Sequence, residues 1–488
     1  MLALLPTRAL ELIVQYLRSI DNNQKDSLPF TQVNRRLRYT TQRLVWEYFT
    51  LSRAIKSHLS YFPRIQRFIS RLQIANDPEL SEAQWLDGLR HMGALDWGHV
   101  RMVSVELDGF YGYPEAAGGV VEFVHGRLSG VSELWVALSD DMETVRSMVE
   151  GARYPNVEEL RIVGKASSSS LTEHVSRVVV PEYGGLTAIS LDGASVAMTS
   201  VAELVGRSRA ALRELNIEEY SVAMAALLGL HPDSKWMEYP RLRQLAISSE
   251  EASEYKAVID GRRLPAVEML YYREASYPLP SGSGYSPIFD SPCARLMQGE
   301  WRGLRLLVVD ALSRGDIEAV GRKAPRLEVL RVGMLSSDID FGDLLPPAPA
   351  LDLGSVSLLL ATCGRLVELC VETPEAFEDY YNNHEGADPR LPWYERPFDV
   401  QARVSGGEDN SSGLRSLMLN AWALTFDQML VLFESLGQLV SFEGNLKFNA
   451  SCPATRRLQS PPGHPSLAHL SLVLSTATRH RRRRRYLG

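Results

Sequence analysis

The residue types that perform catalysis are present in this chain, but their spacing fits no reaction centre. There is no G-x-x-x-x-G-K phosphate loop, no H-E-x-x-H zinc motif and no G-x-S-x-G nucleophile turn. The glycine-rich run Ser281–Gly284 lacks the strand and helix that would let it hold a phosphate. The ten histidines show no metal-ligand spacing, as the isolated His91 and His99 illustrate. The sequence therefore predicts a protein without enzyme activity, bound metal or cofactor.

The composition is typical of a soluble globular protein in a reducing compartment. Of 488 residues, 45% are hydrophobic, the mean hydropathy is −0.13, and no apolar run approaches the roughly eighteen residues of a membrane helix. The four cysteines are scattered without a C-x-x-C pair, which argues against disulfides and a zinc site. A net charge of −7 argues against general nucleic-acid binding. We expect a cytoplasmic or nuclear location, with no membrane partner and no nucleic-acid partner.

A six-residue phrase, aliphatic-x-x-aliphatic-x-aliphatic, recurs along the chain and must position any binding residues. Its copies are Val100–Val105, Val131–Val136, Val157–Ile162, Leu186–Leu191, Leu212–Ile217, Leu242–Ile247, Val267–Tyr272, Leu304–Val309, Leu327–Val332, Leu366–Val371, Leu414–Leu419 and Leu467–Leu472, with a decayed copy at Leu439–Phe442. The first seven begin 25 to 31 residues apart. That period is typical of leucine-rich repeats.

Each copy ends in the alternation of a β-strand, because successive side chains along a strand point to opposite faces. Helical spacing between copies, as in Met142–Val149 and Val201–Val205, indicates strand–helix units. A unit of about thirty residues cannot bury its own core, so neighbouring units must stack into a solenoid. An ordinary α/β sheet with similar strands is the alternative, and the near-constant period argues against it.

The residue before the second aliphatic, the residue after it and the residue that follows the phrase are expected to face outward, on the concave sheet of the solenoid. The charged, amide and aromatic ones are Glu133, Trp135, Glu159, Arg161, Asp192, Glu214, Asn216, Glu218, Gln244, Tyr271, Arg273, Asp310, Arg331, Glu368 and Glu372. Six of these form our candidate for a substrate-binding surface: Trp135, Arg161, Glu214, Asn216, Tyr271 and Arg331. Tryptophan, tyrosine and arginine are the types most enriched at the energetic centres of protein interfaces.

Residues 1–50 show a different pattern, that of short amphipathic helices. Leu10, Ile13 and Leu17 follow Leu5-Pro6 at helical spacing, and Thr31–Tyr48 repeats that spacing with arginines between. About fifty residues of short helices approach the lower size limit for an independent core. Such a segment usually completes its apolar surface against a partner.

This N-terminal pattern resembles the F-box. Leu5-Pro6 matches the opening Leu-Pro of that family, Val33–Leu37 stands for its Val-Cys-Arg block, and Trp46 for its terminal tryptophan. The chain departs from the family at Arg8-Ala9, where Glu-Leu is usual, and at Asn34, which replaces the cysteine. With the repeats included, the chain resembles F-box proteins that carry C-terminal leucine-rich repeats.

The resemblance implies a substrate-recognition adaptor of an SCF-type cullin–RING ubiquitin ligase. The F-box would bind the Skp-type adaptor, and through it the cullin, using Leu5, Pro6, Leu10, Ile13, Leu17, Val33, Leu37 and Trp46. The repeats would hold a substrate protein, so that ubiquitin transfer needs no chemistry from this chain. Two alternatives stay open: residues 1–50 form a helical cap on the repeats, or the chain is a non-degradative interaction scaffold.

The expected organisation is therefore α/β, with a small helical domain followed by an irregular repeat solenoid. Residues 1–50 form the F-box-like domain, 51–98 a helical junction that caps the solenoid, and 99–478 the solenoid itself. Loops are expected near 275–292 and 373–413, which are rich in Gly, Pro, Ser and acidic residues. The basic tail 479–488 fits a nuclear-import signal or phosphate-binding tail as well as a solvated end.

Overall fold

The structure is a computed structural model that falls into two compact units, Met1–Glu218 and Glu219–Gly488. It describes residues 46–57, 65–110, 112–137, 148, 154–163, 183, 185–192, 198–218, 222–249, 259–274, 297–312, 314–335, 358–360, 362–371, 413–424, 429, 432–433, 436, 438–447 and 469–475. The expected F-box helices, up to residue 45, lie outside the described residues.

In the first unit, consecutive strands pair in parallel from one repeat to the next. The strands are β1 (Tyr48–Thr50), β2 (Arg71–Ala75), β3 (Met102–Glu106), β4 (Glu133–Ala137), β5 (Glu159–Val163), β6 (Ala188–Asp192) and β7 (Glu214–Glu218). Their registers align equivalent phrase positions, as Ser104, Trp135 and Arg161 show. The predicted parallel repeat sheet of an α/β chain is confirmed in this unit.

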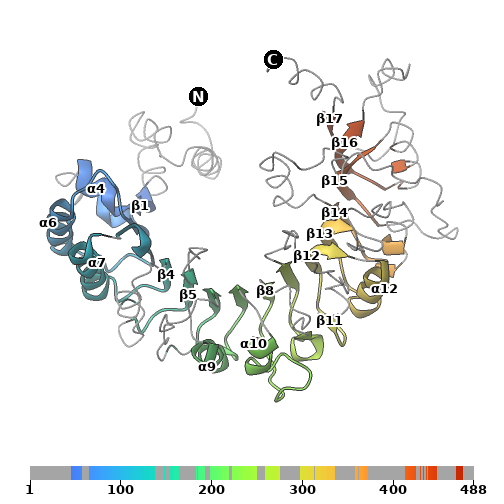
Figure 1. Cartoon of the computed structure of the whole chain (residues 1–488), viewed down its shortest axis with the longest axis horizontal. Helices are drawn as coiled ribbons and strands as arrows, with labels where there is room; N and C mark the ends of the chain where they lie inside the picture. Colours follow the sequence, from blue (N-terminus) through green and yellow to red (C-terminus); the bar gives the residue numbers. More distant parts are fainter. Residues whose placement is uncertain are drawn as a thin grey trace, which may run out of the picture. The chain divides into compact units, whose positions relative to one another are not determined.

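Helices of the first unit lie along one side of its strands, as α6, α7 and α9 show in Figure 1. The helical elements are α4 (Leu51–Ser57), α6 (Glu82–Gly93), α7 (Pro114–Arg127), α9 (Met198–Ser208) and the short 3₁₀ turns η2 (Gln66–Phe68) and η3 (Leu107–Phe110). A capping box at Ser81 and Gln84 begins α6, and Pro114 begins α7. Trp85 packs edge-on against Phe110 in the core beneath these helices, with ring centroids 5.0 Å apart.

The second unit continues the same parallel pattern in its own strands. These are β8 (Gln244–Ser249), β10 (Met269–Glu274), β12 (Leu306–Leu312), β13 (Val329–Leu335), β14 (Glu368–Val371), β15 (Ser416–Leu424), β16 (Ser441–Lys447) and β17 (His469–Ser475). The decayed copy Leu439–Phe442 leads into strand β16, which pairs with β15 and β17, so that copy is a genuine repeat.

The second unit also holds a small parallel pair away from the main ladder. Its strands are β9 (Ile259–Asp260) and β11 (Met297–Gln298), and the unit's helical elements are α10 (Val222–Leu227), α12 (Arg314–Lys323) and the 3₁₀ turn η5 (Gly261–Arg263). Arg263 is 2% exposed and donates hydrogen bonds to the carbonyl oxygens of Pro232, at 2.6 Å, and of Gly229, Ser234 and Lys235. One buried guanidinium thus fixes the loop that follows α10.

A tight turn precedes the phrase in most repeats. The first aliphatic residue donates its backbone N–H to the carbonyl of the residue three positions earlier, as from Val157 to Tyr154 and from Leu242 to Tyr239. That earlier residue is buried in each case. Pro155 and Pro240 occupy the second turn position, where the fixed φ of proline fits. This turn explains why several phrases follow a proline.

The sheet begins earlier than the sequence predicted. Residues 51–98, expected to be a helical junction, include β2 as well as α4 and α6. Ile69, Leu72 and Ile74 form a further copy of the phrase, and all three are buried. The step of three positions from Ile69 to Leu72 also fits a helix, whereas the step of two positions from Leu72 to Ile74 fits only a strand. That second step is the distinguishing feature.

Candidate binding faces

The open face of each unit is the side of the sheet opposite its helices. In β4 and β5, half-buried residues alternate with buried ones, and the half-buried set forms this face. Two rows cross the strands of the first unit. One holds Arg71, Met102, Glu133, Glu159, Ala188 and Glu214, and the other Gln73, Ser104, Trp135, Arg161, Ser190 and Asn216. Neighbours along a row are about 4.8 Å apart.

Three carboxylates gather in the first of these rows, and we call Glu133, Glu159 and Glu214 the acidic row. Glu133 and Glu159 are direct cross-strand neighbours, and Ala188 separates Glu159 from Glu214. Burial raises the pKa of Glu159, the like charges of Glu133 and Glu214 raise it further, and Arg71 acts in the opposite direction. This part of the open face therefore favours a partner with positive charge.

The second row of the first unit combines stacking with amide and hydroxyl groups. The guanidinium of Arg161 lies 4.9 Å from the ring centroid of Trp135, a cation–π contact between neighbouring strands. Asn216 Nδ2 donates to Ser190 Oγ at 3.0 Å. Gln73 Oε1 accepts from the Tyr48 hydroxyl at 2.8 Å. These side chains offer both a flat stacking surface and hydrogen-bonding groups to a partner.

The open face of the second unit is largely apolar over four adjacent strands, β8, β10, β12 and β13. Strands β8 and β10 pair in register, as do β10 with β12 and β12 with β13. The two outward positions of each phrase hold eight residues here, all of them half-buried except the exposed Arg331: Gln244, Ala246, Met269, Tyr271, Leu306, Val308, Val329 and Arg331. Six of the eight are apolar or aromatic, and we call these six the apolar strip: Ala246, Met269, Tyr271, Leu306, Val308 and Val329.

Charged residues border the apolar strip, and they alternate in sign or are already paired. Arg331 Nη2 lies 3.0 Å from Glu368 Oε1 on the neighbouring strand. Arg305 Nε lies 3.9 Å from Glu328 Oε1 just before the strands begin. These pairs leave little net charge around the strip.

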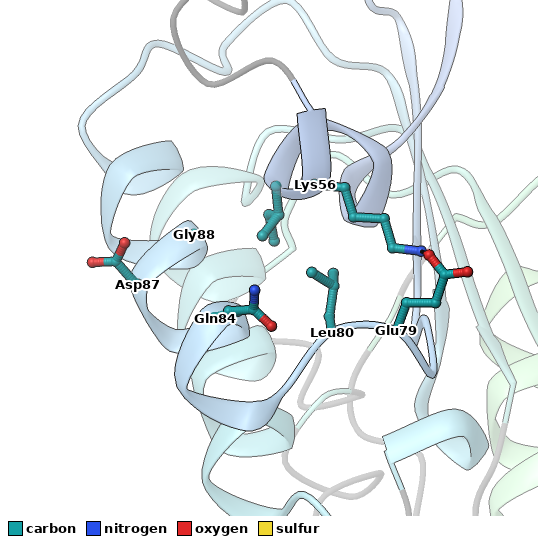
Figure 2. Close-up of a pocket in the computed structure, with 7 residues that line it drawn as sticks. Lys56, Glu79, Leu80, Gln84, Asp87 and Gly88 are labelled. Atoms are coloured by element: carbon teal, nitrogen blue, oxygen red, sulfur yellow. Dashed lines mark hydrogen bonds and ion pairs between the residues drawn. The ribbon is translucent and has the colours of Figure 1, made fainter.

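A hollow of about 370 Å³ lies beside the first strands of the first unit, between α4 and α6 (Figure 2). Ile55, Leu80 and Gly88 are among the residues that line it. Lys56 is held at its edge by Asp77 and Glu79, at 2.5 and 2.6 Å. Asp87, which also lines the hollow, lies 3.5 Å from His91 Nδ1. Across the described residues, no group of three or more His, Cys, Asp or Glu side chains is placed to hold a metal.

The structure brings four of the six candidate substrate-binding residues together on the open face of the first unit. Trp135 stacks on Arg161, and Asn216 follows in the same row. Glu214 is part of the acidic row. The other two are on the second unit, where Tyr271 belongs to the apolar strip and Arg331 pairs with Glu368.

Trp46 lies at the start of the first repeat. Glu47, directly after it, accepts backbone hydrogen bonds from Ser70 and Arg71, the same link that joins later repeats. The Trp46 ring lies 6.0 Å from that of Phe49. The segment that resembles the F-box thus runs directly into β1. The other seven expected adaptor-binding residues, Leu5, Pro6, Leu10, Ile13, Leu17, Val33 and Leu37, lie outside the described residues.

Sequence reasoning missed the apolar outward residues Met269, Leu306, Val308 and Val329. In Leu304–Val309 the outward residues are as apolar as the core-facing ones, so composition alone does not separate the faces. It also missed Gln73 and Glu106, whose side chains are joined by a 2.5 Å hydrogen bond. The signal that finds the first group is the fixed position within the phrase.

Comparison with known proteins gives no family. No protein-family model matches the chain, and no curated protein matches it. One similar solved structure is the crystal structure of the Rad7 and Elc1 complex in yeast, with 12% sequence identity and a TM-score of 0.31, covering 70% of this chain and 91% of that chain. In the part of the chain that the structure describes, no helix is long and apolar enough to cross a membrane.

Proposed function

We propose that this chain is the substrate-recognition subunit of an SCF-type ubiquitin ligase. Residues 1–50 bind a Skp-type adaptor, which joins the chain to the cullin, and the open faces of the repeats bind a substrate protein. The chain contributes no catalytic group. It raises the effective concentration of substrate lysines near the conjugating enzyme.

The observation that carries this proposal is the order of two patterns within a short stretch. The F-box-like pattern from Leu5-Pro6 to Trp46 is followed by β1, which starts at Tyr48. A parallel repeat sheet with an open face follows in the same unit. An adaptor-binding segment and a partner-binding surface in direct succession are the two parts that a substrate receptor requires.

Co-purification of the full chain with the Skp-type adaptor and the cullin tests this function. We expect the wild-type chain to retain both proteins and a Leu5→Ala, Pro6→Ala variant to lose them. The adjacent double variant Thr7→Ala, Arg8→Ala is the matched control, because neither residue matches the family pattern, and it should bind as the wild type does.

Circular dichroism on the same samples shows whether the repeats stay folded. If the folded wild-type chain does not bind the adaptor, the ubiquitin-ligase function is wrong and the chain is a repeat scaffold. Equal loss of binding in both double variants would also contradict the proposal, because binding would then not depend on the F-box pattern.

A further inference from the structure

We propose that the apolar strip of the second unit binds an amphipathic α-helix of the partner protein. This inference deepens the proposed function, on which it rests, by naming the kind of substrate element that the repeats recognise. The strip consists of Ala246, Met269, Tyr271, Leu306, Val308 and Val329.

The strip is unusual for the exposed side of a sheet. The fold requires apolar residues at the core-facing positions, such as Leu245, Leu270 and Leu307, which are fully buried. It makes no such demand on the outward positions, where strands with one solvated face usually alternate apolar and polar residues. Of the eight outward phrase positions on these four strands, six hold apolar or aromatic side chains and only Gln244 and Arg331 are polar. This proportion indicates a surface that is covered by a partner.

A helix suits this surface better than an extended segment. The backbone groups of β10 and β12 already bond to their neighbouring strands, so they are not free to pair with an added strand. The strip's side chains, Tyr271 apart, have no strong hydrogen-bonding group. An extended segment lying on them would lose water from its own N–H and C=O groups without replacement. An α-helix bonds these groups internally and can present one apolar side.

The dimensions and charges of the strip define the helix further. From β8 to β13 there are three strand spacings, or about 14 Å, which corresponds to about ten residues of helix. Apolar residues at i, i+3 or i+4, and i+7 would then face the strip. The bordering pairs Arg305–Glu328 and Arg331–Glu368 are already balanced, so the helix needs no strong net charge.

Val329 and Ser416 provide a matched pair of positions for testing this. Both are outward residues that flank Glu368 in register, one on β13 and the other on β15. A glutamate at either position places a second carboxylate beside Glu368. The two substitutions therefore impose a similar electrostatic change on the fold, but only Val329 belongs to the strip.

The experiment selects binders to the full chain from a displayed library of random 16-residue peptides. We expect the enriched peptides to share apolar residues at helical spacing and to become helical on binding. Val329→Glu should weaken their binding at least about ten-fold. Ser416→Glu should leave it within about two-fold of the wild type.

Four results would overturn the inference: no enriched sequence, enriched peptides with strand-like or proline-rich patterns, binding that is insensitive to Val329→Glu, or an equal loss in both variants. None of these measurements uses the adaptor. Peptide binding with no adaptor binding would therefore refute the ubiquitin-ligase function and leave the helix-binding strip standing, while the reverse result would refute the strip alone.

Discussion

The two units differ at one outward position, the residue directly before the second aliphatic of the phrase. In the first unit, β4, β5 and β7 carry Glu133, Glu159 and Glu214 at this position. In the second unit, β10, β12 and β13 carry Met269, Leu306 and Val329 there. The backbone frame is the same in both units, with parallel strands, equivalent registers and buried aliphatic partners on the helix side. The first unit offers charge, stacking and hydrogen-bonding groups to a partner. The second offers an apolar surface.

The difference shows that the fold constrains one side of each strand and leaves the other to binding. Exchanging a carboxylate for a leucine at an outward position keeps the ladder intact, because the ladder is made by the backbone. A repeat sheet can therefore carry two recognition surfaces of different chemistry along one chain. Each can be changed without altering the core.

The two units also differ in their interiors, and a substitution there is expected to change stability the most. Among the described residues, the buried charged side chains are Asp260 and Arg263, both in the second unit and 1% and 2% exposed. Arg263→Met would leave several carbonyl groups of the loop after α10 without a donor. We expect a loss of about 3–5 kcal/mol in the free energy of unfolding of the second unit.

Hydrogen exchange measures this loss as reduced protection of residues 228–240, with the amides of β3–β5 unchanged. Arg263→Lys should also destabilise, because an ammonium group cannot replace the forked donors of a guanidinium. Arg302→Met is the surface control, since Arg302 is 82% exposed, and should cost less than about 1 kcal/mol. Equal effects of Arg263→Met and Arg302→Met would refute this role of Arg263.

A lysine at equivalent positions in the two faces should change stability in opposite directions. Ala188→Lys places an ammonium between Glu159 and Glu214, its neighbours in register, and should stabilise the first unit by roughly 0.2–1 kcal/mol. Leu306→Lys places the same charge between Met269 and Val329 and should destabilise the second unit by about 1 kcal/mol.

Ionic strength distinguishes the electrostatic effect of Ala188→Lys from the apolar effect of Leu306→Lys. High ionic strength should remove the gain from Ala188→Lys, because the Debye length is about 3 Å at 1 M salt. It should leave the loss from Leu306→Lys, which comes from apolar contact. Denaturation monitored in each unit by hydrogen exchange provides both values. Changes of the same sign in the two units would mean that the faces do not differ as their side chains suggest.

The sequence predicted the strands well, because their signal is repeated and physically required. Alternation such as that of Leu134 and Val136 is needed to bury one side of every strand. The early strand β2 was missed because Ile65, Phe68, Ile69 and Leu72 also have helical spacing. The spacing of the phrase differs from helical spacing only in the alternation of its last three residues. In a single copy, that alternation is a weak indication of a strand.

The candidate site was predicted less completely, for a different reason. Polar and aromatic outward residues such as Trp135 differ in type from their aliphatic neighbours. The outward Leu306 and Val308 have the same residue types as the core-facing Leu307 and Val309, so the sequence does not distinguish them. The Arg263 network has no periodic signal at all, because it joins a turn to a loop about thirty residues earlier. This hydrogen-bond network can be recognised only in the three-dimensional structure.

The smallest expected effect concerns the acidic row and depends on pH. The pKa of Glu159 is raised above its ordinary value of 4.5, first by burial and then by Glu133, Glu214 and Glu158. Between the ordinary and the raised value the folded chain binds more protons than the unfolded chain, so stability falls as pH rises through this window. Above it the unfavourable contribution is fully present.

Glu159→Gln should therefore remove this slope and stabilise the first unit at pH 7 by a few tenths of a kcal/mol. Glu133→Gln is the informative companion, because it removes one like charge and leaves the burial. It should lower the pKa of Glu159 without returning it to the ordinary value. Carboxyl titration by NMR measures that pKa directly, and a value at or below 4.5 in the wild-type chain would contradict the electrostatic difference between the two faces.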